Sequence, residues 1–354
     1  MVTGIVEPTL ALIEKTGLPF AELNQDRGVL SMQHPNYIGS YNGHWAGWSD
    51  SAVTDWVEQC DCIVALATEN HDFNNGFHTL DFDRNGLIKI NPHSTLVGDQ
   101  LFENVEMADV LAQLTEAIQD KLAGDRPKLD SEKVAIGLPT GKPEDIIDYE
   151  PLYERLQQFI NKEDIVVSDT AMASMCFSAR VELPDGVDLE AQLSWGAIGW
   201  GTPAILGNCI AAPQRRCVIV CGEGGHQMTA TEMGTFERYG AKPIYIVVNN
   251  GGYLAERVTN RYPDEDYNNI AHWNFTDLPS SLGCNWLTRK VTNLGELDKA
   301  LTEASECDSG AYIEVVVPAD QLAKGCDFLF GATGKHFEQS ERTWDTRIST
   351  KNRV

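Results

Sequence analysis

The sequence is poor in basic residues and has no long hydrophobic run. Its 354 residues include 27 Lys and Arg against 52 Asp and Glu, which gives a formal net charge of −25. Such a surface repels phosphate backbones and anionic lipids, so we expect no nucleic-acid partner and no membrane partner. Apolar runs such as those at residues 217–221 and 244–248 fall far short of the roughly 20 residues of a membrane-spanning helix. The first residues lack a signal peptide, which predicts a cytoplasmic protein.

The nine cysteines lack the spacing of a disulfide or zinc framework. Nine is an odd number, and no two of these cysteines are separated by two residues. The sequence therefore favours buried structural thiols in a reducing compartment over disulfides or a zinc ribbon.

The composition is that of an ordinary globular protein, with 42% apolar and 22% charged residues. The length corresponds to about two domains. In the first part, helices are predicted from Glu7 to Gly17 and over 107–122, and buried strands over 62–66 and 87–90. Strands separated by helical stretches predict a parallel sheet.

A stretch rich in Gly, Pro, Lys and Asp, at residues 123–148, is typical of an interdomain linker. Beyond it the pattern predicts helices at 149–160 and 227–239 and strands at 165–167, 217–221, 244–248 and 311–317. We therefore predict an α/β fold of two three-layer α/β/α domains with mainly parallel sheets. The domains cover 1–122 and 149–330, and a tail follows at 331–354.

The residues between Arg215 and Glu256 carry the strongest chemical signal. One apolar strand runs into a glycine-rich turn at 222–226, and a second apolar strand ends in the polar turn 249–253. Ligands of open α/β sheets bind at the carboxyl ends of such strands, and a helix start beside glycines favours a phosphate. The Glu223 carboxylate, the Asn250 amide and a backbone carbonyl form the hard oxygen set that Mg²⁺ prefers.

This block resembles the diphosphate-binding domain of thiamine diphosphate enzymes, whose motif runs from Gly-Asp-Gly to a later Asn-Asn pair. Within that superfamily the chain looks most like the pyruvate, indolepyruvate and phenylpyruvate decarboxylases. The similar segments are Asn249 to Glu256 (NNGGYLAE), Tyr267 to Leu278 (YNNIAHWNFTDL), Leu193 to Gly199 (LSWGAIG), Leu18 to Phe20 (LPF) and His34 to Gly39 (HPNYIG). The resemblance implies a central domain at 1–122 and a thiamine diphosphate-binding domain at 149–330.

For the anchored end of the cofactor, the resemblance implies that Glu223, Asn250 and the Gly252 carbonyl bind Mg²⁺. The residues implied along the diphosphate are Thr170, Met172, Gly224 and Gly225. His226, at the start of the following helix, is a further candidate donor to the phosphate, with a capping or surface role as the alternative.

For the reactive end, the resemblance implies that the Gly196 carbonyl contacts the pyrimidine amino group and that Ile198 holds the cofactor bent. Glu256 is then the carboxylate that relays protons beside the thiazolium ring. Such a general acid needs a raised pKa, which a partly desolvated pocket supplies.

The chain departs from the family pattern at four of these positions. Glu223 and Gly251 stand where the relatives have Asp, Met172 stands in place of a Thr, and Gly225 in place of a Ser or Ala. The longer Glu223 side chain changes the reach to Mg²⁺, which tolerates poor geometry badly. The lost hydroxyl groups remove contacts to the diphosphate.

The family's pyrimidine-binding domain, with an activating Glu and an adjacent His pair, is not matched in this sequence, which contains no adjacent histidines. We therefore expect a split 2-oxo acid decarboxylase whose partner subunit carries that domain, as a heterodimer or heterotetramer. The alternatives are a catalytically degenerate regulatory or binding subunit and a truncated product. Relatives carry Ile or Val where this chain has Ala255. The smaller residue indicates either a roomier pocket for an aromatic or branched 2-oxo acid or neutral drift. The reaction expected is decarboxylation or carboligation of that acid.

Overall fold

The structure is a computed structural model that describes residues 4–45, 48–118, 137–259 and 265–325. These residues divide into two compact units. The first takes the described residues of Met1–Gly137, Leu156–Val166 and Ser178–Gly196, and the second takes those of Leu138–Arg155, Val167–Phe177 and Ala197–Val354.

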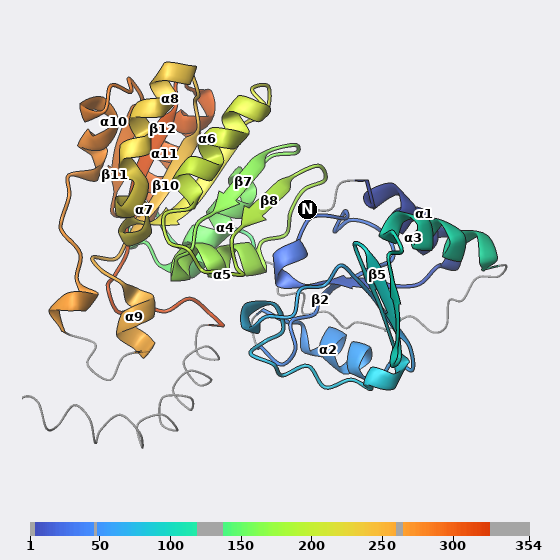
Figure 1. Ribbon diagram of the computed structural model, residues 1–354. Helices are drawn as coiled ribbons and strands as arrows, with labels where there is room; N and C mark the ends of the chain where they lie inside the picture. Colours follow the sequence, from blue (N-terminus) through green and yellow to red (C-terminus); the bar gives the residue numbers. More distant parts are fainter. Residues whose placement is uncertain (1–3, 46–47, 119–136, 260–264, 326–354) are drawn as a thin grey trace, which may run out of the picture. The chain divides into compact units, whose positions relative to one another are not determined.

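Helices and strands alternate through most of the described chain (Figure 1). Up to residue 118 the elements are α1 (Val6–Thr16), β1 (Phe20–Glu22), β2 (Tyr37–Ser40), α2 (Ser51–Glu58), β3 (Ile63–Leu66), β4 (Leu87–Asn91), β5 (Ser94–Val97), β6 (Gln100–Glu103) and α3 (Met107–Ala117). Next come α4 (Tyr149–Phe159), β7 (Ile165–Ser168), α5 (Met172–Arg180), β8 (Asp188–Ala191), α6 (Gly201–Ala211), β9 (Cys217–Gly222), α7 (Glu223–Thr229) and α8 (Met233–Tyr239). The last are β10 (Ile244–Asn249), α9 (Leu254–Thr259), α10 (Leu278–Ser281), β11 (Leu287–Val291), α11 (Leu294–Glu306) and β12 (Ala311–Val316).

The first unit contains a parallel pair, β1 and β2, and a four-stranded sheet in the order β3-β4-β5-β6. In that sheet β3 and β4 are parallel, whereas β4, β5 and β6 form an antiparallel meander. Leu12 of α1, Leu111 of α3 and Ile90 of β4 share one hydrophobic cluster. A second cluster joins Val53 and Val57 of α2 to Tyr41.

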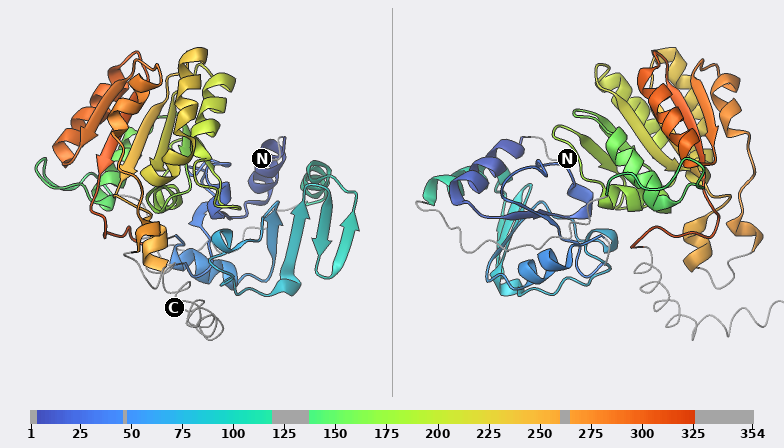
Figure 2. Two further views of the ribbon diagram at one scale, coloured as in Figure 1. Left: turned by 60° about the vertical axis from the view of Figure 1, so that its left-hand side comes forward. Right: turned by 180° about the vertical axis from the view of Figure 1, so that it is seen from behind.

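The larger sheet follows the strand order β11-β12-β10-β9-β7-β8. Its neighbours β9 and β10, β10 and β12, and β11 and β12 are parallel. Strands β9, β10 and β12 are buried along almost their whole length, which is typical of parallel strands covered on both faces. Figure 2 shows helices α6, α7 and α8 over one face of this sheet and α11 over the other.

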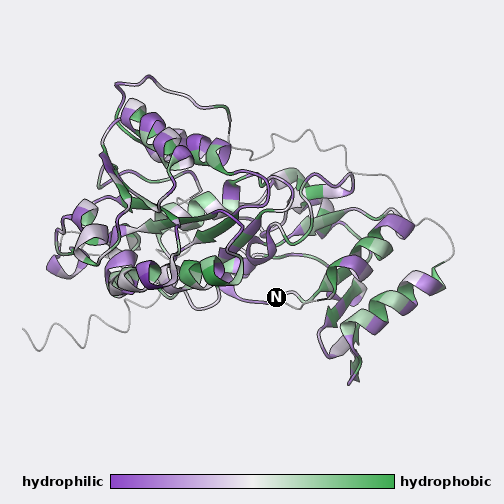
Figure 3. Cartoon of the chain, turned by 90° about the horizontal axis from the view of Figure 1, so that it is seen from above, coloured by the Kyte–Doolittle hydropathy of each residue, from purple (hydrophilic) through white to green (hydrophobic). Residues whose placement is uncertain are grey.

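Hydrophobic residues follow the same arrangement (Figure 3). They concentrate along the strands, and the helices alternate between hydrophobic and hydrophilic residues as amphipathic helices do. In the part of the chain that the structure describes, none of the helices has both the length and the apolar character needed to cross a membrane. The α/β class with parallel sheets is confirmed, although the four-stranded sheet of the first unit has one parallel and two antiparallel pairings.

Most predicted elements are found, and two of the predicted helices differ from their expected bounds. The helix predicted over 227–239 instead begins at Glu223, inside the glycine-rich segment, and is interrupted by a 3-10 turn at Ala230–Glu232 before α8. The helix predicted over 107–122 ends at Ala117. Other elements were not predicted, among them α6, α11 and the hairpin of β5 and β6, whose strands of four residues give too little alternation to detect.

The predicted domain boundaries stay predictions. Most of the predicted linker, residues 119–136, and the whole predicted tail lie outside the described residues. The eight cysteines that lie within the described residues are free thiols, and Cys326 falls beyond them.

Candidate functional site

The candidate site lies where strands β9 and β10 end. These strands are parallel and adjacent, with Gly222 at the end of β9 paired in register with Val248 near the end of β10. Helix α7 begins directly after β9, and the loop 250–253 begins directly after β10. Both polar segments therefore emerge at the same edge of the sheet, which is the ligand-binding edge of open α/β sheets.

The Glu223 side chain joins these two segments. Only 2% of Glu223 is exposed, and its Oε1 accepts hydrogen bonds from the backbone N–H groups of Asn250, at 3.2 Å, and Gly252, at 2.9 Å. The three residues predicted to bind a metal are thus brought together by direct contacts, although their role as ligands stays a prediction.

Burial changes the acidity of this carboxyl group. Desolvation raises the pKa of Glu223 from 4.5 to about 7, and the backbone N–H donors offset only part of that rise. Burial and backbone hydrogen bonds are the causes that set the pKa of Glu223. A buried carboxylate without a counter-charge is costly, and a bound cation would remove that cost.

Asn250 and Gly252 are also held in place by the protein itself. Asn250 Nδ2 donates to the hydroxyl oxygen of Tyr149 at 3.3 Å, and Asn250 Oδ1 accepts from Gly252 N at 3.3 Å. The Gly252 carbonyl accepts from Leu254 N at 3.1 Å. Arg257 Nη2 donates to the neighbouring Gly251 carbonyl at 3.3 Å, which leaves a fixed cation beside the loop.

The donor set fits a hard divalent cation. It consists of one buried carboxylate, one amide oxygen and one main-chain carbonyl at adjacent strand ends. Among the described residues, no group of three or more His, Cys, Asp or Glu side chains could hold a metal. A site built on Glu223 therefore depends on neutral oxygens, phosphate oxygens and water, which is the environment that Mg²⁺ commonly takes.

Asp169 organises the neighbouring segments and was missed at the sequence level. Its carboxylate is fully buried: Oδ1 accepts from the N–H groups of Thr170, at 2.9 Å, and Gly201, at 3.0 Å, while Oδ2 accepts from Gly199 N at 3.1 Å. Desolvation raises the pKa of this carboxyl group above its usual value. The only sequence signal was a single acidic residue directly after β7.

Packing leaves little room for a side chain at the two glycines at the start of α7. A Cβ atom on Gly224 would lie 2.5 Å from the ring of Tyr253, and one on Gly225 would lie 3.1 Å from Asp169 Oδ2. The same atom on Gly225 would lie 3.5 Å from the Thr170 carbonyl oxygen, so Thr170 and Gly225 are neighbours. Two of the predicted diphosphate residues, Thr170 and Gly225, therefore lie close together.

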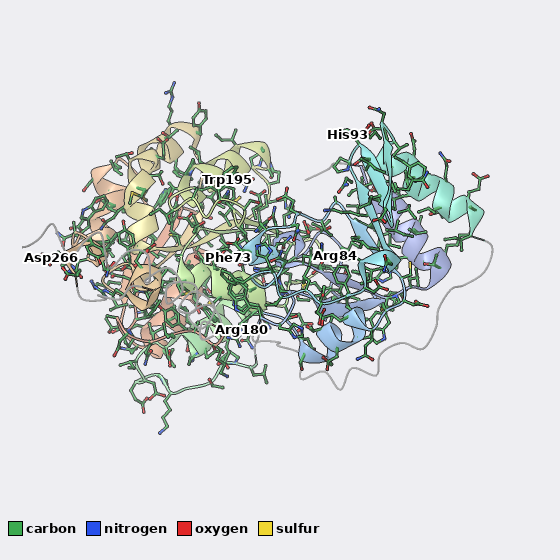
Figure 4. All side chains as sticks on the ribbon, turned by 60° about the horizontal axis from the view of Figure 1, so that its bottom comes forward. Phe73, Arg84, His93, Arg180, Trp195 and Asp266 are labelled. Carbon is green, nitrogen blue, oxygen red and sulfur yellow. The ribbon has the colours of Figure 1, made fainter. Side chains whose placement is uncertain are left out.

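Ile198 precedes Gly199, which Asp169 holds, and it is 41% exposed. A Cβ atom on Gly199 would lie 2.8 Å from Cβ of Met228, whose side chain is also exposed. Gly196 belongs to the first compact unit and is exposed, with a left-handed φ of +58°. Its neighbour Trp195, labelled in Figure 4, is 86% exposed.

The remaining candidates lie in different surroundings. Met172 begins α5 and is buried, with its sulfur 4.0 Å from the Cys176 thiol. Glu256 is exposed in the first turn of α9. Both roles stay predictions.

His226 points into the interior of the second unit. It is fully buried between the rings of Tyr245 and Tyr312, with Nδ1 3.2 Å from the Thr202 hydroxyl. Burial lowers the pKa of its imidazole to about 4, so the ring is neutral at physiological pH. A surface position, one of the sequence-based alternatives, is therefore wrong, while its contact with a phosphate stays a prediction.

Two family profiles match the chain. The profile of the thiamine pyrophosphate enzyme central domain covers residues 2–118, and that of the C-terminal TPP binding domain of thiamine pyrophosphate enzymes covers residues 172–315. The second match contains Glu223 and the loop 250–253.

Curated relatives match the chain over a longer stretch than either profile. An alpha-keto-acid decarboxylase of Mycobacterium ulcerans (strain Agy99) is 33% identical over 324 residues, which are 91% of this chain and 56% of the relative. Proteins of the same name from Mycobacterium leprae (strain TN) and Mycobacterium tuberculosis (strain ATCC 25618 / H37Rv) are 32% and 31% identical, over 89% and 91% of this chain. The chain spans about half the length of the relatives it matches, 54% and 57% for the last two.

Proposed function

Because the chain belongs to the thiamine pyrophosphate enzymes, we propose that it is the diphosphate-binding subunit of a thiamine diphosphate- and Mg²⁺-dependent 2-oxo acid decarboxylase. The proposed reaction converts a 2-oxo acid and a proton into an aldehyde and CO₂, with carboligation of the aldehyde unit as the variant outcome. The observation that carries the proposal is the contact of the buried Glu223 carboxylate with the loop that holds Asn250 and Gly252.

In this proposal Glu223, Asn250 and the Gly252 carbonyl hold Mg²⁺. Thiamine diphosphate, when bound, supplies the nucleophilic carbon and the electron sink for loss of CO₂. The protein orients the diphosphate end through Gly224, Gly225 and the segment after β7. Asp169 keeps that segment and the start of α6 in place through three backbone hydrogen bonds.

Glu256 is the proposed proton donor and acceptor of this chain. It lies on α9, three residues after Tyr253, whose pKa is raised by burial first and then by the charges of Glu223 and Glu256. Since Glu256 is exposed in the single chain, the proposal requires a covering surface that desolvates it in the active complex.

We further propose that this surface, with the pyrimidine-binding part of the site, belongs to a partner subunit, in a heterodimer or heterotetramer. Large apolar side chains near the site support this proposal, since Ile198, Met228 and Tyr267 are all exposed. Exposed apolar groups beside a binding site are typical of protein–protein contacts. Ala255, next to Glu256, would give an aromatic or branched 2-oxo acid more space than a larger residue.

A degenerate regulatory or binding subunit is the second candidate. It is favoured by Glu223 in the place of the Asp that the family resemblance implies, and by two backbone donors that already satisfy one oxygen of this residue. In that case Glu223→Asp, which shortens the side chain by roughly 1.5 Å, restores binding that the wild-type chain lacks.

Calorimetric titration of the 354-residue chain with thiamine diphosphate separates the two candidates. We expect saturable binding that requires Mg²⁺, is abolished by EDTA, and is weakened at least roughly tenfold in Asn250→Ala. Glu303→Ala, which removes a partly exposed carboxylate paired with Arg289, is the matched control and keeps wild-type affinity. If the wild-type chain binds no thiamine diphosphate in the presence of Mg²⁺, the proposal of a diphosphate-binding subunit is rejected.

A second experiment tests the decarboxylase assignment. A subunit with the His pair and the activating Glu is added to the chain, and CO₂ release that depends on thiamine diphosphate is measured.

A further inference from the structure

A buried glutamate interrupts the apolar strand β12. Glu314 is only 1% exposed, although the other residues of the strand are Ala, Tyr, Ile and Val. A carboxylate at such a position is unfavourable unless it is hydrogen-bonded or paired with a cation. Its partners therefore indicate why the position is polar.

Glu314 Oε1 has two donors on neighbouring strands. Lys290 Nζ of β11 lies 2.8 Å away and Asn249 Nδ2 of β10 also lies 2.8 Å away. In the sheet register, Glu314 lies opposite Lys290 of β11 on one side and opposite Val247 of β10 on the other. Asn249 lies two residues beyond Val247, so the three polar side chains share one face of the sheet.

The contact with Glu314 fixes the orientation of the Asn249 amide. With Nδ2 directed at the carboxylate, Oδ1 accepts from Gly251 N at 3.1 Å. An Asn side chain has donors at one end and an acceptor at the other, so a reversed amide would lose both contacts. Gly251 is in the left-handed region, with φ of +78°, at the turn that carries Asn250 and Gly252.

We infer that Glu314 is a positioning residue that acts through Asn249 to hold the loop 250–253 in the conformation that meets Glu223. The hydrogen bonds from Asn249 Nδ2 to Glu314 Oε1 and from Gly251 N to Asn249 Oδ1 form a relay between the sheet and that loop. Lys290, whose side chain is 55% exposed, balances the charge of Glu314 and is screened by solvent. That the loop binds a metal rests on the proposed function, whereas the relay itself does not.

Amide hydrogen exchange at Gly251 in the cofactor-free chain tests the relay. Glu314→Leu introduces an apolar side chain of similar size and removes the acceptor for Asn249. We expect the rate of amide exchange at Gly251 to rise at least roughly tenfold. Glu314→Gln keeps an acceptor oxygen, and Lys290→Met keeps the Glu314–Asn249 contact, so both stay within about threefold of the wild type. Asn249→Ala removes the relay without touching the strand interior and raises exchange as Glu314→Leu does.

Equal exchange at Gly251 in folded Glu314→Leu and wild type overturns the inference. If Glu314→Leu does not fold, equal exchange in Asn249→Ala and wild type overturns it instead. A purely structural role predicts faster exchange throughout β12 and no recovery in Glu314→Gln, which also contradicts the relay.

Affinity for Mg²⁺ and thiamine diphosphate supplies the second readout. We expect Glu314→Leu and Asn249→Ala to weaken binding by similar factors, and the double variant to be no weaker than either by more than about twofold. Additive effects contradict the relay. A wild-type chain that binds no cofactor while Gly251 responds as expected rejects the proposed function and supports the relay.

Discussion

Among the predicted metal ligands, Glu223 is the one whose side chain carries a charge. Its burial raises the pKa of the carboxyl group to about 7, with desolvation as the main cause. Glu22 in the first unit also has a pKa of about 7, again because of burial, although Arg27 partly offsets that rise. At neutral pH both carboxyl groups therefore oppose folding, and only Glu223 has backbone neighbours that are themselves candidate metal ligands.

The pH dependence of stability follows from the Glu223 pKa. Between pH 4.5 and about 7 the folded chain keeps a proton on Glu223 that the unfolded chain has lost. The free energy of unfolding therefore falls as pH rises through this window, by roughly 3 kcal/mol from this group, and stays level above it. Glu223→Gln removes that fall, because the amide does not ionise.

Urea denaturation at pH 5 and pH 8, without Mg²⁺ or cofactor, measures this difference. Wild-type chain loses more stability between the two pH values than Glu223→Gln, whereas Glu303→Gln behaves like the wild type. Identical pH dependence of the wild type and Glu223→Gln would disprove the assignment of the raised pKa.

At the scale of elements, α7 is shaped by what surrounds it. It begins at Glu223 although two glycines follow, and glycine costs up to about 1 kcal/mol in a helix relative to alanine. The ring of Tyr253 and the carboxylate of Asp169 occupy the space that side chains at Gly224 and Gly225 would need. At this helix start, packing therefore outweighs the low helix propensity of glycine.

Alanine substitutions distinguish propensity from packing. Gly224→Ala forces the Tyr253 ring to move, and we expect it to destabilise the chain by roughly 1–3 kcal/mol. Gly207→Ala, in α6, meets no atom within 4 Å and is expected to stabilise the chain by up to about 1 kcal/mol. Chemical denaturation of the two variants measures both effects. A stabilising Gly224→Ala would contradict the packing explanation.

At the scale of the whole molecule, the dominant property is the net charge of −25. Self-repulsion of this size lowers the stability of the folded state and is screened by salt. We expect the melting temperature to rise on going from low salt to 0.5 M NaCl, by roughly 2–4 °C for each kcal/mol of repulsion removed. Choline chloride serves as the control for specific sodium binding and gives the same rise. A melting temperature that falls with both salts would contradict the prediction.

The same elements show how far sequence patterns reach. The ends of α1 and α8 were predicted from Gly17 and Gly240, and both glycines are left-handed caps. The start of α7 was not predicted, because glycines indicate a turn when their neighbours in space are unknown. Asp169 was missed for a similar reason, since its role depends on backbone N–H groups thirty and more residues away.

The sequence by itself determined the α/β class, the strands β3, β4, β7, β9, β10 and β12, and the segment that carries the candidate site. It could do so because hydrophobic periodicity and glycine caps are local properties of the chain. Only the tertiary structure decided that Glu223 touches Asn250 and Gly252, that His226 is buried, and that Glu314 supports the loop through Asn249. These features depend on which groups, far apart in the sequence, meet at a strand edge or a buried face. Local sequence patterns do not contain that information.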